Sequence, residues 1–155
     1  MVNPSRFSFG GKSAIVTGLG LIIGLGAARA NTATIVSGLL IVGLADNMTD
    51  SLSFHMYQEA ERLEERAALR ATTSNFVVRI LIALSFVGVV LLLPHTYGGI
   101  VALSWGCRLL ATISSTVARA RGGSPWRETA KHLGVAFLVI VAIRLVGAWI
   151  VAYVH

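Results

Sequence analysis

The sequence has one cysteine, few prolines and few charged residues, and these shortages exclude several kinds of protein. Because Cys107 is the only cysteine, the chain cannot form an internal disulfide, and the redox state of its compartment stays open. Charged residues make up 13% of the chain, against about 25% in soluble domains. The mean hydropathy is +0.75. Together these values predict an integral membrane protein.

Sequence motifs of enzymes and of nucleic-acid binding are missing as well. No segment resembles a hydrolase triad, a phosphate-binding loop or a paired-cysteine metal site, so we expect that the protein is not an enzyme. The formal net charge is +6, but the arginines lie between apolar runs instead of forming one basic stripe. We interpret this charge as membrane topology and expect no nucleic-acid partner.

Five apolar segments are long enough to cross a bilayer, for which roughly 20 residues are needed. They cover residues 13–30, 32–57, 75–94, 97–117 and 130–154. The first follows two basic residues and resembles a cleavable signal peptide, but we interpret it as a retained span. We therefore predict an all-α fold in which residues 1–155 form one bundle of five transmembrane helices. The bilayer is its first expected partner.

The positions of lysine and arginine predict the orientation of this bundle. Arg29 falls on one side of the membrane, and the other side receives Arg6, Lys12, Arg62, Arg66, Arg70, Arg79, Arg119, Arg121, Arg127 and Lys131. By the positive-inside rule, the N-terminus is cytoplasmic and the C-terminal His155 lies across the membrane. We expect a bacterial-type cytoplasmic membrane, with an organelle membrane as the alternative.

The second helix is predicted to continue beyond the membrane. Between Thr32 and Arg70 there is no proline, and there is no glycine after Gly43, so one continuous helix is the simplest interpretation. Its extension, residues 58–71, would project into the cytoplasm. Glutamates and arginines alternate there, which is typical of a solvated helix or of an acidic entrance that gathers cations.

Small residues at four-residue spacing mark faces where helices can approach closely. The first span has Gly20, Gly24 and Ala28, and the fourth has Gly98, Ala102 and Gly106. These faces indicate either packing within one chain or dimerisation, and we favour packing within the chain.

Two carboxylates lie inside the second span, where a charge near the bilayer centre costs at least ~2.5 kcal/mol. Asp46 and Asp50 are one helical turn apart and therefore share a face. A hairpin turn between the first two spans would place Lys12 at the level of Asp50. We therefore expect a salt bridge from Lys12 to Asp50, and also to Asp46, near the cytoplasmic boundary.

Two arginines are predicted to lie near mid-bilayer. Arg108 and Arg144 are each about eleven to fourteen residues inside a predicted span. At that depth an unpaired guanidinium is costly, so we expect both to face the bundle interior, with Asp46 as the nearest acid. The charged residues then form either a functional site or a buried structural network.

Softer metal donors follow the two aspartates along the second helix. His55, Met56 and Glu59 offer imidazole, thioether and carboxylate groups, which suit divalent transition metals. His55 and Glu59 are spaced i,i+4 and could share an ion, whereas Met56 is expected mainly to pack. We assign no role to the other three histidines.

Several segments carry a resemblance to a known family. GGKSAIVTGLGLIIGL and VSGLLIVGLADNMTDSLSFHMYQEAE resemble the first two helices of the vacuolar iron transporter family. The likeness continues through LSFVGVVLLLP, ISSTVARARGG and WRETAKHLGVAFLVIVAIRLVGAWI and so covers nearly the whole chain. The resemblance implies five spans, a cytoplasmic N-terminus, and a site for Fe²⁺ or Mn²⁺ at a homodimer interface through the first two helices.

The family's ligand positions are altered in this chain. Where the family has an aspartate, a methionine and an acidic ligand, the sequence has Ser13, Phe54 and Gln58. Asp50 does match a family acid. Divalent cations need anionic or strongly donating ligands, and Lys12, which lies beside one altered position, would repel them.

Three functions follow from these observations. The first is a transporter of iron or manganese with a rebuilt site around Asp46, Asp50, His55, Met56 and Glu59. The second is a transport-inactive structural or accessory subunit of a larger membrane assembly, with a salt bridge in place of the metal. The third is a carrier for an anionic or proton-coupled substrate that uses Arg108 and Arg144.

Overall fold

The computed structural model describes residues 4–60 and 65–154, and the side chains at 4–9, 54, 58–60, 65, 67–68 and 95–96 lie outside that description. The described residues form helices and no strand. The helices are α1 (Pro4–Ala27), α2 (Thr32–Ala60), α3 (Glu65–Leu92), α4 (His95–Ala120) and α5 (Pro125–Tyr153). The predicted all-α class is confirmed.

All five helices contain a stretch long and apolar enough to cross a membrane. These stretches are Gly10–Ala27, Thr32–Tyr57, Leu69–Leu92, Tyr97–Ala120 and Pro125–Tyr153. Pro94 precedes α4 and Pro125 begins α5, as expected of residues that end or begin helices. The fold is therefore compatible with a multi-pass integral membrane protein.

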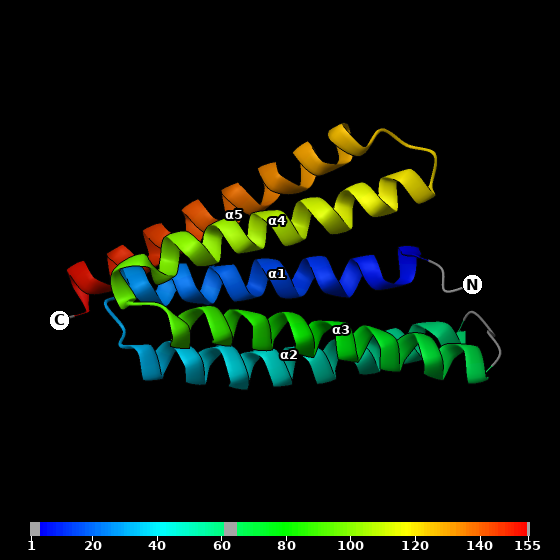
Figure 1. Ribbon diagram of the computed structural model, residues 1–155. Helices are drawn as coiled ribbons and strands as arrows, with labels where there is room; N and C mark the ends of the chain where they lie inside the picture. Colours follow the sequence, from blue (N-terminus) through cyan, green and yellow to red (C-terminus); the bar gives the residue numbers. More distant parts are fainter. Residues whose placement is uncertain (1–3, 61–64, 155) are drawn as a thin grey trace.

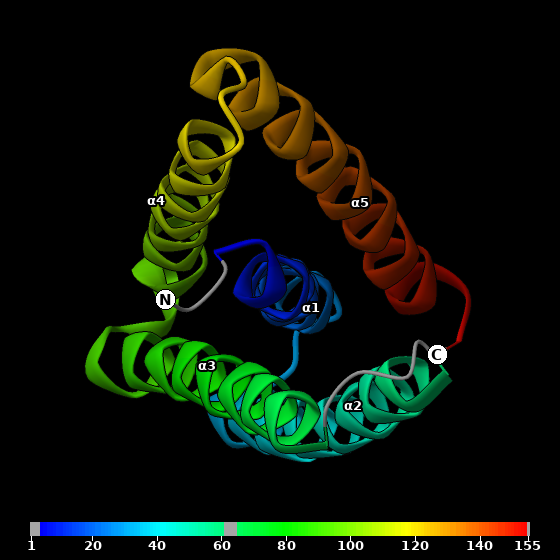
Figure 2. The same ribbon diagram turned by 90° about the vertical axis from the view of Figure 1, so that its right-hand side faces the viewer.

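Helix α1 lies at the centre of the bundle. Seen along the bundle, the other four helices surround it, with α2 and α3 on one side and α4 and α5 on the other (Figure 2). Consecutive helices are antiparallel, so the described chain begins at one end and finishes at the other (Figure 1). Short connections join α1 to α2 and α3 to α4 as antiparallel hairpins.

The central position of α1 explains which of its residues are buried. Ile15, Leu19 and Ile22 recur at helical spacing and are at most 4% exposed, and they pack in one core with Phe86 and Leu110. Many apolar side chains of the outer helices point away from the bundle, which suits hydrocarbon surroundings because lipid does not require a polar surface.

Glycines allow α1 to lie close to α5. A Cβ atom at Gly24 would lie 2.5 Å from Ile143, and a Cβ atom at Gly147 would lie 2.5 Å from the carbonyl oxygen of Gly24. On α4, a Cβ atom at Gly106 would lie 2.6 Å from Leu19. At Gly24, Gly106 and Gly147 the small residues are therefore packed by contacts within the chain, in agreement with the prediction.

The second helix is shorter than predicted. α2 ends at Ala60 and α3 already begins at Glu65, so the prediction of one helix from Thr32 to Arg70 is wrong. Residues 61–64 lie outside the described residues, and residues 65–71 belong to α3. The reason is tertiary packing, since α2 makes its most extensive contacts with the antiparallel α3. The hairpin of α2 and α3 reaches past the start of α1 (Figure 1).

Candidate functional site

A buried guanidinium joins the two aspartates of α2. Arg79 Nη2 lies 2.5 Å from Asp46 Oδ2, and Arg79 Nη1 donates a hydrogen bond to Asp50 Oδ2. The arginine side chain is 2% exposed, whereas the two aspartate side chains are 36% and 33% exposed. The positive charge is therefore enclosed between α2 and α3, while the negative charges remain accessible at its edge.

Helix α1 closes this cluster with its backbone. The carbonyl oxygen of Gly10 accepts a hydrogen bond of 3.4 Å from Arg79 Nη1. Gly10 is buried against Asn75, and a side chain at this position would collide with the Asn75 amide. A glycine is therefore required for α1 to approach α3 closely enough to contact the arginine.

Each aspartate is followed along α2 by a residue with a buried neutral oxygen, about 100° further around the helix. Asn47 is fully buried and donates from Nδ2 to the carbonyl oxygen of Phe76 at 3.0 Å. Within the part of the chain that the structure describes, Asn47 Oδ1 and Ser51 Oγ have no hydrogen-bond partner, although both are buried. Unsatisfied buried acceptors are costly and call for a water, a proton donor or a cation.

A small cavity adjoins the cluster. It has a volume of about 20 Å³ and is bordered by Asp46 and Arg79 together with Ala14, Thr17 and other residues of the first three helices. This volume suffices for a single water, for which about 10–15 Å³ is the minimum. The cluster is thus compact, with space at Asp46 for one small guest.

The charges of this cluster do not balance. Two carboxylates face one guanidinium, which gives a formal charge of −1. By the helix rise, Asp50 and Asp46 lie roughly 10 Å and 16 Å from Tyr57, where the apolar stretch of α2 ends. Excess negative charge at such depth is expensive in lipid, so the cluster favours an additional proton or cation.

Lys12 does not supply that charge. Its Nζ atom lies 3.1 Å from Nε2 of His132 on α5, so the predicted salt bridge from Lys12 to Asp50 is wrong. The predicted depth of Lys12 in the membrane was reasonable, but the predicted direction of its side chain was not. Lys12 follows Gly10 by two residues, or about 200° around the helix, so it faces away from the cluster that Gly10 contacts.

His132 contacts Lys12, an interaction that the sequence did not indicate. Its Nδ1 atom lies 2.6 Å from the carbonyl oxygen of Glu128 and must carry the hydrogen, because a carbonyl only accepts. Nε2 of the neutral ring can then accept from the Lys12 ammonium. Lys12 is therefore held by α5 in a separate polar pocket of about 250 Å³ that also contains Arg121 and Ser114.

The other two arginines are not where the sequence placed them. Arg108 is exposed on α4, because the buried face of that helix runs through Ala102, Gly106 and Leu110. Arg144 is also exposed and lines a separate cavity near the opposite end of the bundle. Neither pairs with Asp46, whose partner is Arg79. The prediction that both arginines face the interior is wrong for Arg108, whereas Arg144 lines a cavity between the helices, and neither has Asp46 as its partner.

The proposed soft donors do not converge on a metal site. Met56 is 60% exposed and points away from the bundle, and His55 is half-buried. Among the described residues, no three histidine, cysteine, aspartate or glutamate side chains are close enough to hold a metal together. Of the positions suggested by the family, Ser13 is half-buried on α1. The side chains of Phe54, Gln58 and Glu59 lie outside the described residues.

Arg79 is the residue that the sequence analysis misjudged. It was counted as a cytoplasmic topology charge, although it lies inside the third predicted span. A signal was present, because in an antiparallel hairpin between Ala60 and Glu65 residues whose numbers add to about 125 lie level. Asp46 is level with Arg79 by this rule. The prediction of one continuous helix left no α2–α3 hairpin in which this pairing could be recognised.

The fold and this cluster define the class of the protein as a five-helix bundle, compatible with a multi-pass membrane protein, with a polar site between α1, α2 and α3. No family model matches the chain, and neither the curated proteins nor the solved structures contain a match.

Proposed function

We propose that this protein is an integral membrane transporter for a small divalent cation, with Asp46 and Asp50 as the cation site. The observation that carries the proposal is the excess negative charge of the cluster, in which two partly exposed carboxylates share one buried guanidinium. The resemblance of the sequence to vacuolar iron transporters supports Fe²⁺ or Mn²⁺ as the cargo.

The donor atoms of the cluster fit such a cargo. Mn²⁺ and Fe²⁺ accept carboxylate and neutral oxygen ligands. Asp46 and Asp50 provide the carboxylates, and Asn47 Oδ1 and Ser51 Oγ are buried oxygens without a hydrogen-bond partner in the described chain. The cation would enter at the exposed edge of the aspartates.

In this proposal Arg79 acts as a tethered competitor of the cargo. It neutralises one carboxylate equivalent while the site is empty, and the arriving cation takes over one or both aspartates. A permanent internal cation of this kind lowers affinity but assists release, which a transporter needs as much as binding.

Orientation and assembly belong to the same proposal. The end of the bundle that contains Arg119, Arg121, Arg127 and Lys131 would be cytoplasmic, because Arg29 is the single basic residue at the α1–α2 turn. A homodimer through α1 and α2 is the assembly that the family resemblance suggests.

The test is cation uptake by proteoliposomes that contain the purified protein. We expect Mn²⁺ uptake above protein-free vesicles, and we expect Asp46→Asn and Asp50→Asn each to reduce it at least about tenfold, because each removes a charged ligand. Glu128→Gln is the matched control. It removes one negative charge, as the aspartate variants do, but Glu128 pairs with Lys131 away from the cluster. Uptake equal to that of empty vesicles would reject the proposal.

A second function is favoured by one specific observation. Arg79 already contacts both aspartates, and the described side chains include no group of three metal-type ligands. A salt bridge in place of a metal is what a transport-inactive accessory subunit would contain. This alternative predicts that gentle detergent extraction isolates the chain within a larger complex, whereas purification as an active transporter on its own would argue against it.

A further inference from the structure

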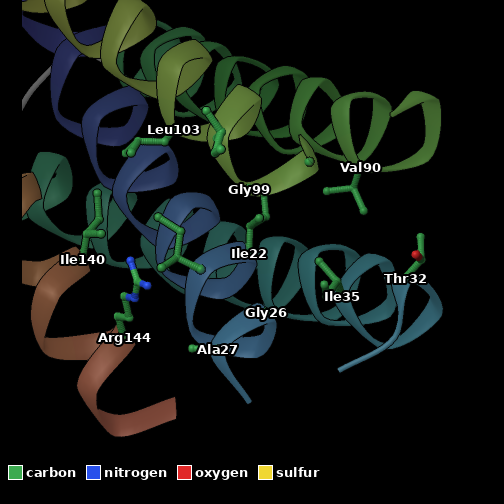
Figure 3. Close-up of a pocket in the computed structure, with 13 residues that line it drawn as sticks. Ile22, Gly26, Ala27, Thr32, Ile35, Val90, Gly99, Leu103, Ile140 and Arg144 are labelled. Carbon is green, nitrogen blue, oxygen red and sulfur yellow. The ribbon is translucent and has the colours of Figure 1, made fainter. Parts of the chain in front are cut away.

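A large cavity lies near the end of the bundle where α1 turns into α2. It measures about 430 Å³, within the range of about 300–1,000 Å³ typical of ligand pockets. Side chains from all five helices line it, among them Ile22, Ile35, Val90, Leu103 and Ile140 (Figure 3). Its walls are therefore mainly apolar.

Among the described residues that line this cavity, Arg144 is the only charged one. Its side chain extends from α5 toward α1 and lies beside Ile140 (Figure 3). Helical side chains lean toward the N-terminus of their helix, so Arg144 leans toward the middle of α5 and into the cavity. It does not reach toward the nearer helix end at Tyr153, as a snorkelling arginine would.

Arg144 has no carboxylate partner among the described residues. The described ion pairs engage Asp46 and Asp50 with Arg79 and Glu128 with Lys131. An uncompensated guanidinium beside apolar walls is costly inside a membrane. An anion from outside the chain would remove this cost.

The depth of Arg144 indicates where that anion comes from. Ile143 packs against Gly24, so its neighbour Arg144 lies about one to two helical turns, or ~6–8 Å, below the α1–α2 turn. Along α5, Arg144 lies nine residues, or about 13 Å, before Tyr153, where the apolar stretch ends, so it belongs to the half of the span at that end. A lipid of the leaflet at that end can place its phosphate near Arg144 and an acyl chain along the apolar walls.

We propose that this cavity binds an anionic phospholipid, with the phosphate on Arg144 and an acyl chain between α1, α4 and α5. Basic pockets between membrane helices bind anionic headgroups in this manner. The inference is independent of cation transport, because it uses a different cavity and a different charged residue.

Two glycines on α4 permit a test that keeps the arginine. Gly98 and Gly99 line the cavity, and a Cβ atom at either would meet no other atom within 4 Å. Gly99→Leu would therefore place apolar atoms in the acyl-chain space, and its Cβ atom would displace no neighbour. Gly134 is a matched control on α5, since a Cβ atom there also meets nothing and it does not line the cavity.

The experiment is native mass spectrometry of the detergent-purified protein, titrated with phosphatidylglycerol, with phosphatidylcholine of the same chains, and with oleate. We expect one phosphatidylglycerol to bind at least about tenfold more tightly than phosphatidylcholine, a difference of ~1.4 kcal/mol. We expect Arg144→Gln and Gly99→Leu each to remove this preference. Arg108→Gln, which makes the same charge change outside the cavity, and Gly134→Leu should retain it.

Three results would overturn the proposal. The first is equal binding of phosphatidylglycerol and phosphatidylcholine, and the second is tight binding of oleate by a protein that does not bind phosphatidylglycerol. The third is unchanged binding of phosphatidylglycerol by Gly99→Leu. If Arg144→Gln does not fold, Gly99→Leu still decides, because it leaves the charge in place and removes only the space.

Discussion

Arg79 and Arg144 lie in similar helices but meet their charge requirements in different ways. Arg79 is 2% exposed and contacts two aspartates and a backbone carbonyl. Arg144 is exposed, lines an apolar cavity, and has no carboxylate partner in the described part of the chain. Two carboxylates of the same chain more than neutralise the charge of Arg79. No carboxylate that the structure describes neutralises the charge of Arg144.

The difference concerns packing as well as charge. Around Arg79 the packing is tight, and a side chain at Gly10 would have to displace the buried Asn75 amide. Around Arg144 the same bundle opens, and Gly99 faces empty space. A tightly packed region can hold a fixed ion network, whereas an open region can accept a molecule from outside. The comparison therefore separates the proposed cation site from the proposed lipid site.

The largest expected effect comes from removing the buried arginine. Arg79→Met would leave two carboxylates without their partner and should lower the free energy of unfolding by about 3 kcal/mol, the lower end of the range for broken buried pairs, because the aspartates are partly exposed. Arg144→Met should change it by less than about 1 kcal/mol, since no described ion pair is lost. Unfolding in mixed detergent and sodium dodecyl sulfate, followed by circular dichroism, measures both.

A compensating variant makes this prediction specific to the ion cluster. Combining Arg79→Met with Asp46→Asn and Asp50→Asn removes all three charges and should recover most of the lost stability, because the uncompensated carboxylates are gone. If Arg79→Met is as stable as the parent, or if the triple variant is no better than the single one, the cluster does not stabilise the bundle as described.

An intermediate effect is expected from a pair of glycines. Gly10→Ala would press a methyl group into Asn75 and should lower the free energy of unfolding by ~1–3 kcal/mol, the usual cost of overpacking. Gly99→Ala has free space and should be neutral or raise it by up to ~1 kcal/mol, because alanine favours the helix. The same unfolding assay applies to both, and equal effects would contradict the contrast between a tight and an open region.

The general architecture could be predicted from the sequence because it depends on features that are local in the chain. Apolar length predicted five spans, and the structure has five helices that are long and apolar enough to cross a membrane. The small-residue face of α1 likewise packs within the chain, where Gly24 contacts Ile143.

The candidate site was predicted only in part, since its geometry depends on directions around each helix. The aspartate pair was found because Asp46 and Asp50 are one turn apart on the same helix. Its partner Arg79 was missed because no glycine or proline marks the α2–α3 reversal, which follows from tertiary packing. Lys12 was assigned to the wrong neighbour because matching depth says nothing about which side of α1 a residue faces.

The smallest expected effect distinguishes a contact of Lys12 with His132 from a salt bridge of Lys12 with Asp50. Lys12 Nζ contacts Nε2 of His132 at 3.1 Å, so Lys12→Gln should lower the free energy of unfolding by only ~0.5–1.5 kcal/mol, the usual value of one hydrogen bond. A salt bridge to Asp50 would instead cost about 3 kcal/mol on removal. In the double variant with Arg79→Met the two losses should simply add, since Lys12 and Arg79 share no partner in the described chain. If Lys12→Gln lowered the free energy of unfolding as much as Arg79→Met, or if the two effects were strongly coupled, we would conclude that Lys12 pairs with the aspartates.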